Sequence, residues 1–187
     1  MWFLGPKIVR KILYTGFKIS YIRFKFMPPE FGKHSLNRDF EKIIQTFPEK
    51  MQILSDSLPF SKENLQKAPD KGIYVFYDEH DLPIYVGRSD RIKARLREHS
   101  QLGSTNTSAT FAFNLAKDLA KDIGIDTKLP RKDLEKILEF KQIYNDTKTR
   151  VSKMKIRSIG ISDPIEQTLF EVYVHLELKT KNEFNNH

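Results

Sequence analysis

The stretch Lys71–Ser100, KGIYVFYDEHDLPIYVGRSDRIKARLREHS, decides the fold predicted for this chain of 187 residues. It holds two short runs of β-branched and aromatic residues, Ile73–Tyr77 and Pro83–Val86, with a polar turn between them. Such runs are typical of strands, and a basic amphipathic segment follows them at once. The pattern therefore predicts a strand, a hairpin turn, a second strand and a helix.

The turn sets which residues of the two predicted strands face each other. A four-residue loop, DEHD, would pair Tyr77 with Leu82. It would also place Tyr74 opposite Tyr85, and residues paired in this way share a face of the sheet. The two phenols would then lie side by side. Gly87 is expected to end the second strand, because glycine allows the sharp change of direction that must follow.

The basic segment is expected to begin a helix at Ser89 or Asp90, since both residue types cap helix N-termini well. Arg91, Arg95 and His99 follow at intervals of four and would share one helical face. Phenols and imidazoles can move protons, and a guanidinium can bind two phosphate oxygens at once. The hairpin and helix together thus predict a site that handles a phosphate.

These residues resemble the motif of the GIY-YIG endonucleases. The chain carries GIY at 72–74, YVG at 85–87 and RLREH at 95–99, in the order and at the spacing of that family. The resemblance runs from about residue 69 to 185, with an enlarged middle. It implies a stand-alone nuclease domain that hydrolyses DNA phosphodiester bonds with the help of one divalent metal ion.

The resemblance also implies which residues perform the chemistry. The expected catalytic set is Tyr74, Tyr85, Arg95, His99 and Glu171. A hard cation beside a phosphate needs a carboxylate ligand, and Glu171 would hold Mg²⁺ or Mn²⁺, with Glu166 and Glu177 as alternatives. Contacts with the substrate are expected from Gly87, Arg88, Arg91 and Asn185.

Downstream of this site, the alternating pattern of residues 154–162 predicts a third strand. Ser162 or Asp163 should cap a final helix that begins at Pro164 and ends near Leu178. Further helices are expected at 37–54 with a break at Pro48, at Thr110–Ile123, and from Pro130 past Tyr144. We therefore expect an α/β fold of the α+β type, with the GIY strand, the YVG strand and residues 154–162 forming a small antiparallel sheet flanked by helices.

Three regions are expected along the chain. Residues 1–29 form a basic aromatic arm with six Lys or Arg and no acidic residue. This arm suits nucleic-acid binding, a targeting or membrane-surface role, or simple packing on the domain. Residues 30–68 are a helical lead-in packed on the core, and residues 69–187 are the nuclease-like domain with a helical insertion at about 101–153. The arm or the insertion is expected to select the substrate.

Composition narrows the function classes further. The net charge of +8 favours anionic partners, DNA first and RNA not excluded. The absence of cysteine excludes disulfides and thiolate zinc sites. No apolar run reaches the ~20 residues of a membrane span, so we expect a cytoplasmic protein.

Several aspects of the function stay open at this level. Roles in DNA repair, in a mobile element or in restriction are all compatible with the motif, as is any oligomeric state. The sequence or structure that would be cut is equally open. The alternative function is a catalytically inactive module of the same fold that binds nucleic acid.

Overall fold

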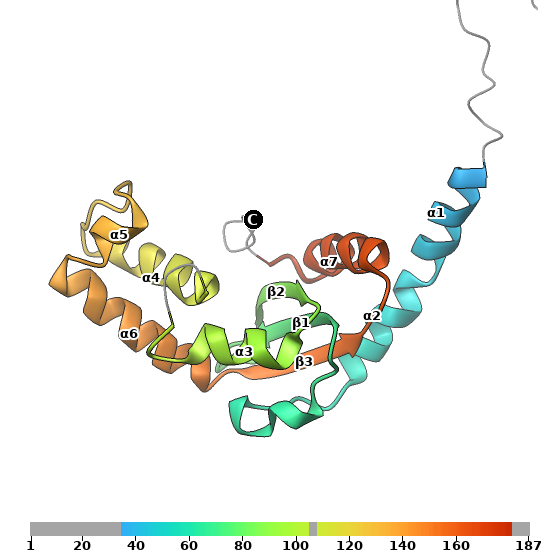
Figure 1. Cartoon of the computed structure of the whole chain (residues 1–187), viewed down its shortest axis with the longest axis horizontal. Coiled ribbons are helices and arrows are strands. Elements are labelled where there is room, and N and C mark those ends of the chain that lie inside the picture. Colours follow the sequence, from blue (N-terminus) through green and yellow to red (C-terminus); the bar gives the residue numbers. More distant parts are fainter. Residues whose placement is uncertain (1–34, 105–107, 181–187) are drawn as a thin grey trace, which may run out of the picture. The chain divides into compact units, whose positions relative to one another are not determined.

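A three-stranded antiparallel sheet with helices packed around it forms the centre of the structure, a computed structural model that describes residues 35–104 and 108–180 (Figure 1). The expected α+β fold class is therefore confirmed. The arm at residues 1–29 and the expected substrate contact Asn185 lie outside the described residues.

The described elements follow the predicted order. The strands are β1 (Gly72–Tyr77), β2 (Pro83–Ser89) and β3 (Lys155–Gly160). The helices are α1 (Ser35–Gln45), α2 (Phe47–Asp56), the 3₁₀ helix η1 (Lys62–Lys67), α3 (Ile92–Ser100), α4 (Thr110–Asp122), α5 (Arg131–Leu134), α6 (Leu138–Ser152) and α7 (Pro164–Leu178). The single helix expected from Pro130 past Tyr144 is two helices, because Ile137 between them has an extended backbone.

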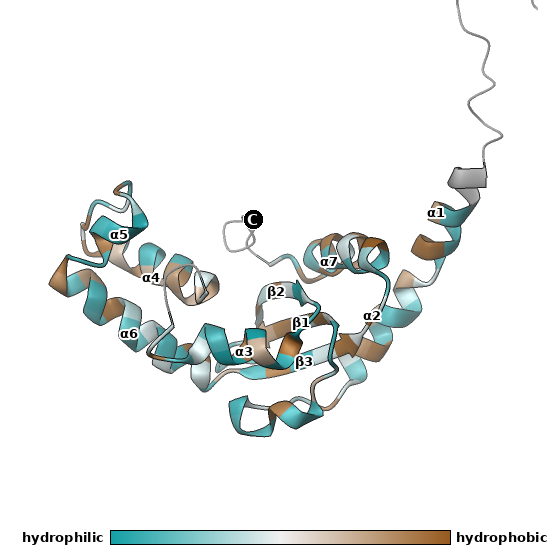
Figure 2. Ribbon diagram, in the orientation of Figure 1, coloured by the Kyte–Doolittle hydropathy of each residue, from teal (hydrophilic) through white to brown (hydrophobic). Residues whose placement is uncertain are grey.

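Strand β1 lies between β2 and β3 and is buried on both faces. Ile73 and Val75 pack with residues of α2 and α7, whereas Tyr74 and Phe76 pack with residues of α3 and α4. Figure 2 shows the apolar residues of β1, α2 and α7 in brown. Burial on both faces explains why β1 is apolar or aromatic along nearly its whole length, without polar alternation.

The pairing of β1 with β2 differs from the expected register. Tyr74 lies opposite Gly87, and Phe76 lies opposite Tyr85. An irregularity after Phe76 pairs Tyr77 with Pro83, so the predicted pairing with the preceding leucine was wrong. The difference at Tyr74 is two residues, and a shift by an even number keeps every side chain on its predicted face. The two phenols therefore still share a face.

The start of α3 is also later than expected. Strand β2 continues through Gly87 to Ser89, so Gly87 does not end it. The helix begins at Ile92, with Arg91 at the N-cap. The Ser89 hydroxyl accepts a hydrogen bond from the Arg91 amide at 3.0 Å, while the Asp90 carboxylate accepts one from a glutamine of α7 at 3.2 Å. Because Arg91 precedes the helix, it is not part of the helical face that carries the other two predicted residues.

The aromatic residues of α4 and α6 extend the hydrophobic cluster that contains Tyr74. The ring of Phe113 on α4 lies 5.3 Å from the rings of both Phe140 and Tyr144 on α6. Beside them, the buried Lys148 donates hydrogen bonds of 2.9 Å to the carbonyls of Leu102 and Ser104. This lysine joins α6 to the turn that follows α3, so α6 is anchored next to the predicted site.

Candidate active site

Two tyrosines and a histidine meet on the face of the sheet covered by α3. The Tyr74 hydroxyl on β1 and Nε2 of His99 on α3 are hydrogen bonded at 2.9 Å. The ring of Tyr85, on β2, lies 6.2 Å from that of Tyr74 and 5.5 Å from that of His99. All three side chains are buried, with exposed fractions of 0 to 3%. Three separate elements thus bring the predicted aromatic residues into one cluster.

Arg95 on α3 adjoins this cluster and is partly exposed. Its Nη1 donates to the Ser108 carbonyl at 2.8 Å and lies 3.4 Å from the Glu98 carboxylate. Burial raises the pKa of Tyr74 and of Tyr85, and the nearby guanidinium of Arg95 opposes that rise in both. The arginine is therefore placed to stabilise negative charge on either phenol.

His99 is held in its neutral form. Burial, and to a smaller extent the charge of Arg95, lowers the pKa of His99 from 6.5 to about 3. Within the part of the chain that the structure describes, its Nδ1 has no hydrogen-bond partner. If the Tyr74 hydroxyl donates to Nε2, the single ring proton is on Nδ1.

The burial of His99 predicts instability in acid. Its pKa is lower in the folded protein than in the unfolded chain, so folding excludes a proton that the unfolded chain binds. The contribution of neutral His99 to the free energy of unfolding is complete above pH 6.5. It decreases as the pH falls toward about 3, by up to about 5 kcal/mol in total. Urea unfolding measures the free energy of unfolding at pH 7 and at pH 4.5. The decrease between these two pH values should be clearly smaller in His99→Gln than in wild type. The exposed His80 provides the control, His80→Gln, which should lose as much as wild type. An equal loss in all three proteins would contradict the assignment.

Glu171 projects from α7 and is nearly buried. Its Oε2 accepts a hydrogen bond of 2.9 Å from Nε of Arg88, and the two side chains are 10% and 40% exposed. Arg88 lies opposite Ile73 and hence on the α7 face of the sheet, whereas Tyr85 lies on the other face. The charge of Glu171 nevertheless raises the pKa of Tyr85. Glu171 is therefore within electrostatic reach of the tyrosine cluster across the edge strand β2.

The other two candidate metal ligands lie elsewhere. Glu166 forms an ion pair of 2.7 Å with Lys50 of α2, and Glu177 is exposed. No group of three or more histidines, aspartates and glutamates that could hold a metal occurs in residues 35–104 and 108–180. A single carboxylate still fits Mg²⁺, which commonly takes one or two carboxylates together with phosphate and water oxygens. Glu171 is the carboxylate that would hold it here.

Gly87 lies directly against the ring of Tyr74, which leaves no room for a side chain at this position. A Cβ at Gly87 would lie 2.6 Å from Cζ and from the hydroxyl oxygen of the Tyr74 ring. This ring is buried and cannot swing into solvent. The sequence predicted that Gly87 ends a strand and contacts the substrate. In the structure it lies within β2, where the packing of Tyr74 requires a glycine.

Gly87→Ala should consequently displace the Tyr74 ring and weaken its hydrogen bond to His99. We expect a loss of about 1–3 kcal/mol in the free energy of unfolding, the usual cost of overfilling a packed interior. Denaturant unfolding measures it, with Gly103→Ala as the control because a Cβ at Gly103 meets nothing within 4 Å. Equal stability of both variants would show that the ring moves without cost.

Two residues of the site were missed by the sequence analysis. Phe111 of α4 is fully buried and stacks on Tyr85 at 4.4 Å between ring centroids. Nothing local in the sequence marks Phe111, because its contact with Tyr85 joins α4 to β2, which are far apart in the chain. Glu98 lies 2.6 Å from Arg91 and 3.4 Å from Arg95, and so links the two arginines. The spacing of three between Arg95 and Glu98 was a signal that could have identified this pair.

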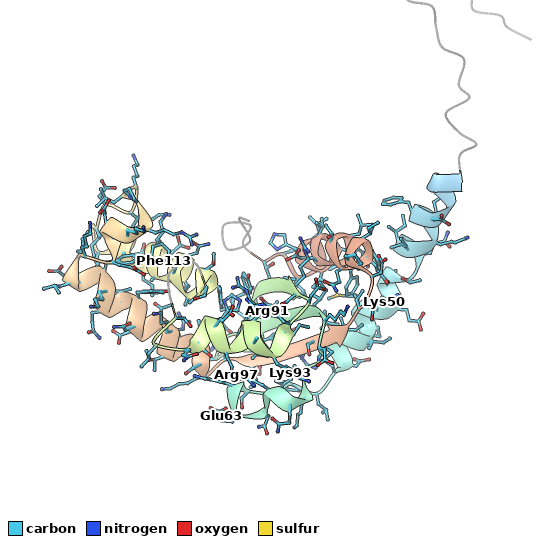
Figure 3. All side chains as sticks on the ribbon, viewed as in Figure 1. Lys50, Glu63, Arg91, Lys93, Arg97 and Phe113 are labelled. Carbon is cyan, nitrogen blue, oxygen red and sulfur yellow. The ribbon has the colours of Figure 1, made fainter. Side chains whose placement is uncertain are left out.

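Arg91 itself is exposed and lies outside the aromatic cluster. Figure 3 shows Arg91, Lys93 and Arg97 near one another at α3. They line a surface hollow together with Asp70 and Asp90. The expected role of Arg91 in binding a substrate therefore concerns this outer surface of α3, separate from the buried tyrosines.

Comparison with known proteins adds no assignment: no family model, no curated protein and no solved structure matches the chain. Among the described helices, none has the length and apolar character to cross a membrane.

Proposed function

We propose that this protein is a metal-dependent endonuclease that hydrolyses DNA phosphodiester bonds. The observation that supports it most is the convergence of Tyr74, Tyr85, Arg95 and His99 from β1, β2 and α3, with the Tyr74–His99 hydrogen bond at its centre. Glu171 of α7 is within electrostatic reach of this group. These are the groups that the resemblance to GIY-YIG endonucleases names.

A phosphate would meet the arginines of the site first. The side chains of Arg88 and Arg95 are 40% and 23% exposed, whereas Tyr74, Tyr85 and His99 are buried. Guanidinium groups bind phosphate oxygens through paired, charge-assisted hydrogen bonds. Arg95 would neutralise the charge that builds up on the phosphoryl oxygens during attack by water.

The Tyr74–His99 pair provides a route for the proton of the attacking water. Tyr74 would take that proton on its phenol oxygen while its own proton passes to Nε2 of His99. Burial acts against the imidazolium that results, but the negative charge of a bound phosphate favours it. Tyr85 would orient the phosphate or the water. Mg²⁺ or Mn²⁺, held by Glu171, would supply further charge neutralisation at the phosphate and the leaving oxygen.

The experiment that tests the proposal is a nicking assay on supercoiled plasmid and on branched oligonucleotides. We expect cutting with Mg²⁺ or Mn²⁺ and none with EDTA. Single-stranded and duplex RNA belong in the same assay, because the site geometry does not distinguish the two nucleic acids. Binding of nucleic acid with no cutting under any of these conditions would overturn the enzymatic proposal.

One observation favours the alternative function, an inactive module that binds nucleic acid. Tyr74 and His99 are almost completely inaccessible, and Glu171 is already paired with Arg88. Such a module would lose affinity steeply as salt is raised, and its binding would not depend on a divalent ion. Measuring DNA affinity against salt and against Mg²⁺ separates the two functions.

A further inference from the structure

The ion pair between Arg88 and Glu171 joins residues 83 positions apart in the sequence. The Glu171 side chain is only 10% exposed, and a buried carboxylate is costly unless an opposite charge compensates it. Nε of Arg88 lies 2.9 Å from Oε2 and supplies this charge. Arg88 therefore holds the carboxylate that the proposed function assigns to the metal.

We propose, resting on the proposed function, that Arg88 competes with the divalent cation for Glu171 and that a nucleic-acid phosphate removes this competition. The phosphate would bind the guanidinium of Arg88, and the carboxylate of Glu171 would then be available to bind the metal. Metal and nucleic acid then bind cooperatively, and the metal binds weakly until a nucleic acid is present.

The geometry of Arg88 suits such an exchange. Its side chain is 40% exposed at the edge strand β2, so a phosphate can reach it from solvent. The bond to Glu171 uses Nε, and a guanidinium carries five N–H groups in a planar fork that matches phosphate oxygens. A cation and a guanidinium that share one small carboxylate also repel each other, which favours release of the arginine.

Thermodynamic linkage makes the coupling reciprocal. If nucleic acid raises the affinity for the metal, the metal raises the affinity for nucleic acid by the same factor. Coupling between two sites is commonly about 5- to 150-fold. Both directions can be measured without any cutting of the substrate.

The first measurement is the affinity for Mn²⁺ in the absence of nucleic acid, read from the electron paramagnetic resonance signal of free Mn²⁺. Arg88→Gln should bind Mn²⁺ about tenfold more tightly than wild type, within the usual range of coupling. Arg150→Gln is the matched control, because Arg150 has the same 2.9 Å ion pair, with Glu79, and a similar exposure of 41%. It should bind like wild type, and Glu171→Gln should not bind.

The second measurement is decided by the wild-type protein, so its main outcome does not depend on how any variant folds. The affinity for a short fluorescent DNA duplex is read by anisotropy at constant ionic strength, with and without Ca²⁺. We expect Ca²⁺ to tighten binding about tenfold in wild type and by a smaller factor in Arg88→Gln.

The outcomes separate this inference from the proposed function. The proposed competition would be overturned if Arg88→Gln bound Mn²⁺ no more tightly than wild type. It would also be overturned if Ca²⁺ left the DNA affinity of wild type unchanged. If no protein binds Mn²⁺ with or without the DNA duplex, the metal-dependent function itself fails.

Discussion

Gly72→Ala should destabilise this protein more than any other substitution considered for it, by about 4 kcal/mol or more. Gly72 has a φ of +139°, which residues with a side chain rarely adopt. A Cβ at this position would lie 2.0 Å from the carbonyl oxygen of Ile159 and 2.8 Å from the amide nitrogen of Ile161. Both are backbone atoms beside the central strand, so the clash cannot be relieved by rotating a side chain. The pairing of β1 with β3 would have to open.

Urea unfolding followed by circular dichroism measures this loss. Gly103→Ala is again the appropriate control, since that glycine has neither a positive φ nor a neighbour within 4 Å of an added Cβ. If Gly72→Ala unfolds at the same urea concentration as Gly103→Ala, the described register between β1 and β3 is wrong.

The largest expected effect on activity is that of Arg95→Ala and of Glu171→Gln. Each should lower the rate of metal-dependent cutting by about 10²- to 10³-fold or more, the usual cost of removing one group that stabilises charge in the transition state. Arg95 is a guanidinium that acts on both phenols, because its charge opposes the rise in the pKa of Tyr74 and of Tyr85. Glu171 is the carboxylate that would hold the metal, and its amide analogue keeps the shape of the side chain.

The control for this pair is Arg150→Ala, an arginine of α6 that pairs with Glu79 and does not line the surface hollow of α3. Circular dichroism and thermal unfolding should show that all three variants are folded. Since Arg95 also holds the Ser108 carbonyl, a folded Arg95→Lys variant provides a second test in which the positive charge is kept but the paired geometry is lost. Cutting close to the wild-type rate in Arg95→Ala or Glu171→Gln would remove that residue from the catalytic set.

The hydrophobic pattern of the sequence was sufficient for the strands, for most of the helices and for the faces of the sheet, although the helix expected from Pro130 is α5 and α6. Side chains alternate strictly along a strand, so Tyr74 and Tyr85 were placed on one face even though the predicted register was wrong by two residues. Pro48 indicated a break in the first helical segment, which lies at Thr46, and Pro48 itself is in the first turn of α2. Asp163 and Pro164 marked the start of α7, where the Asp163 carboxylate accepts a hydrogen bond from the Glu166 amide at 2.7 Å. These features depend on residues close together in the chain.

Tertiary structure alone decided what surrounds these residues. The sequence contains the histidine, but only the packing of α3 and α4 on the sheet buries His99 and lowers its pKa to about 3. It contains the arginine and the glutamate, but only the placement of α7 beside β2 pairs Arg88 with Glu171. Burial and ion pairing depend on contacts between residues far apart in the chain, and no local pattern specifies them. The sequence by itself therefore determined which chemical groups this protein carries, and the tertiary structure decided their charge and their partners.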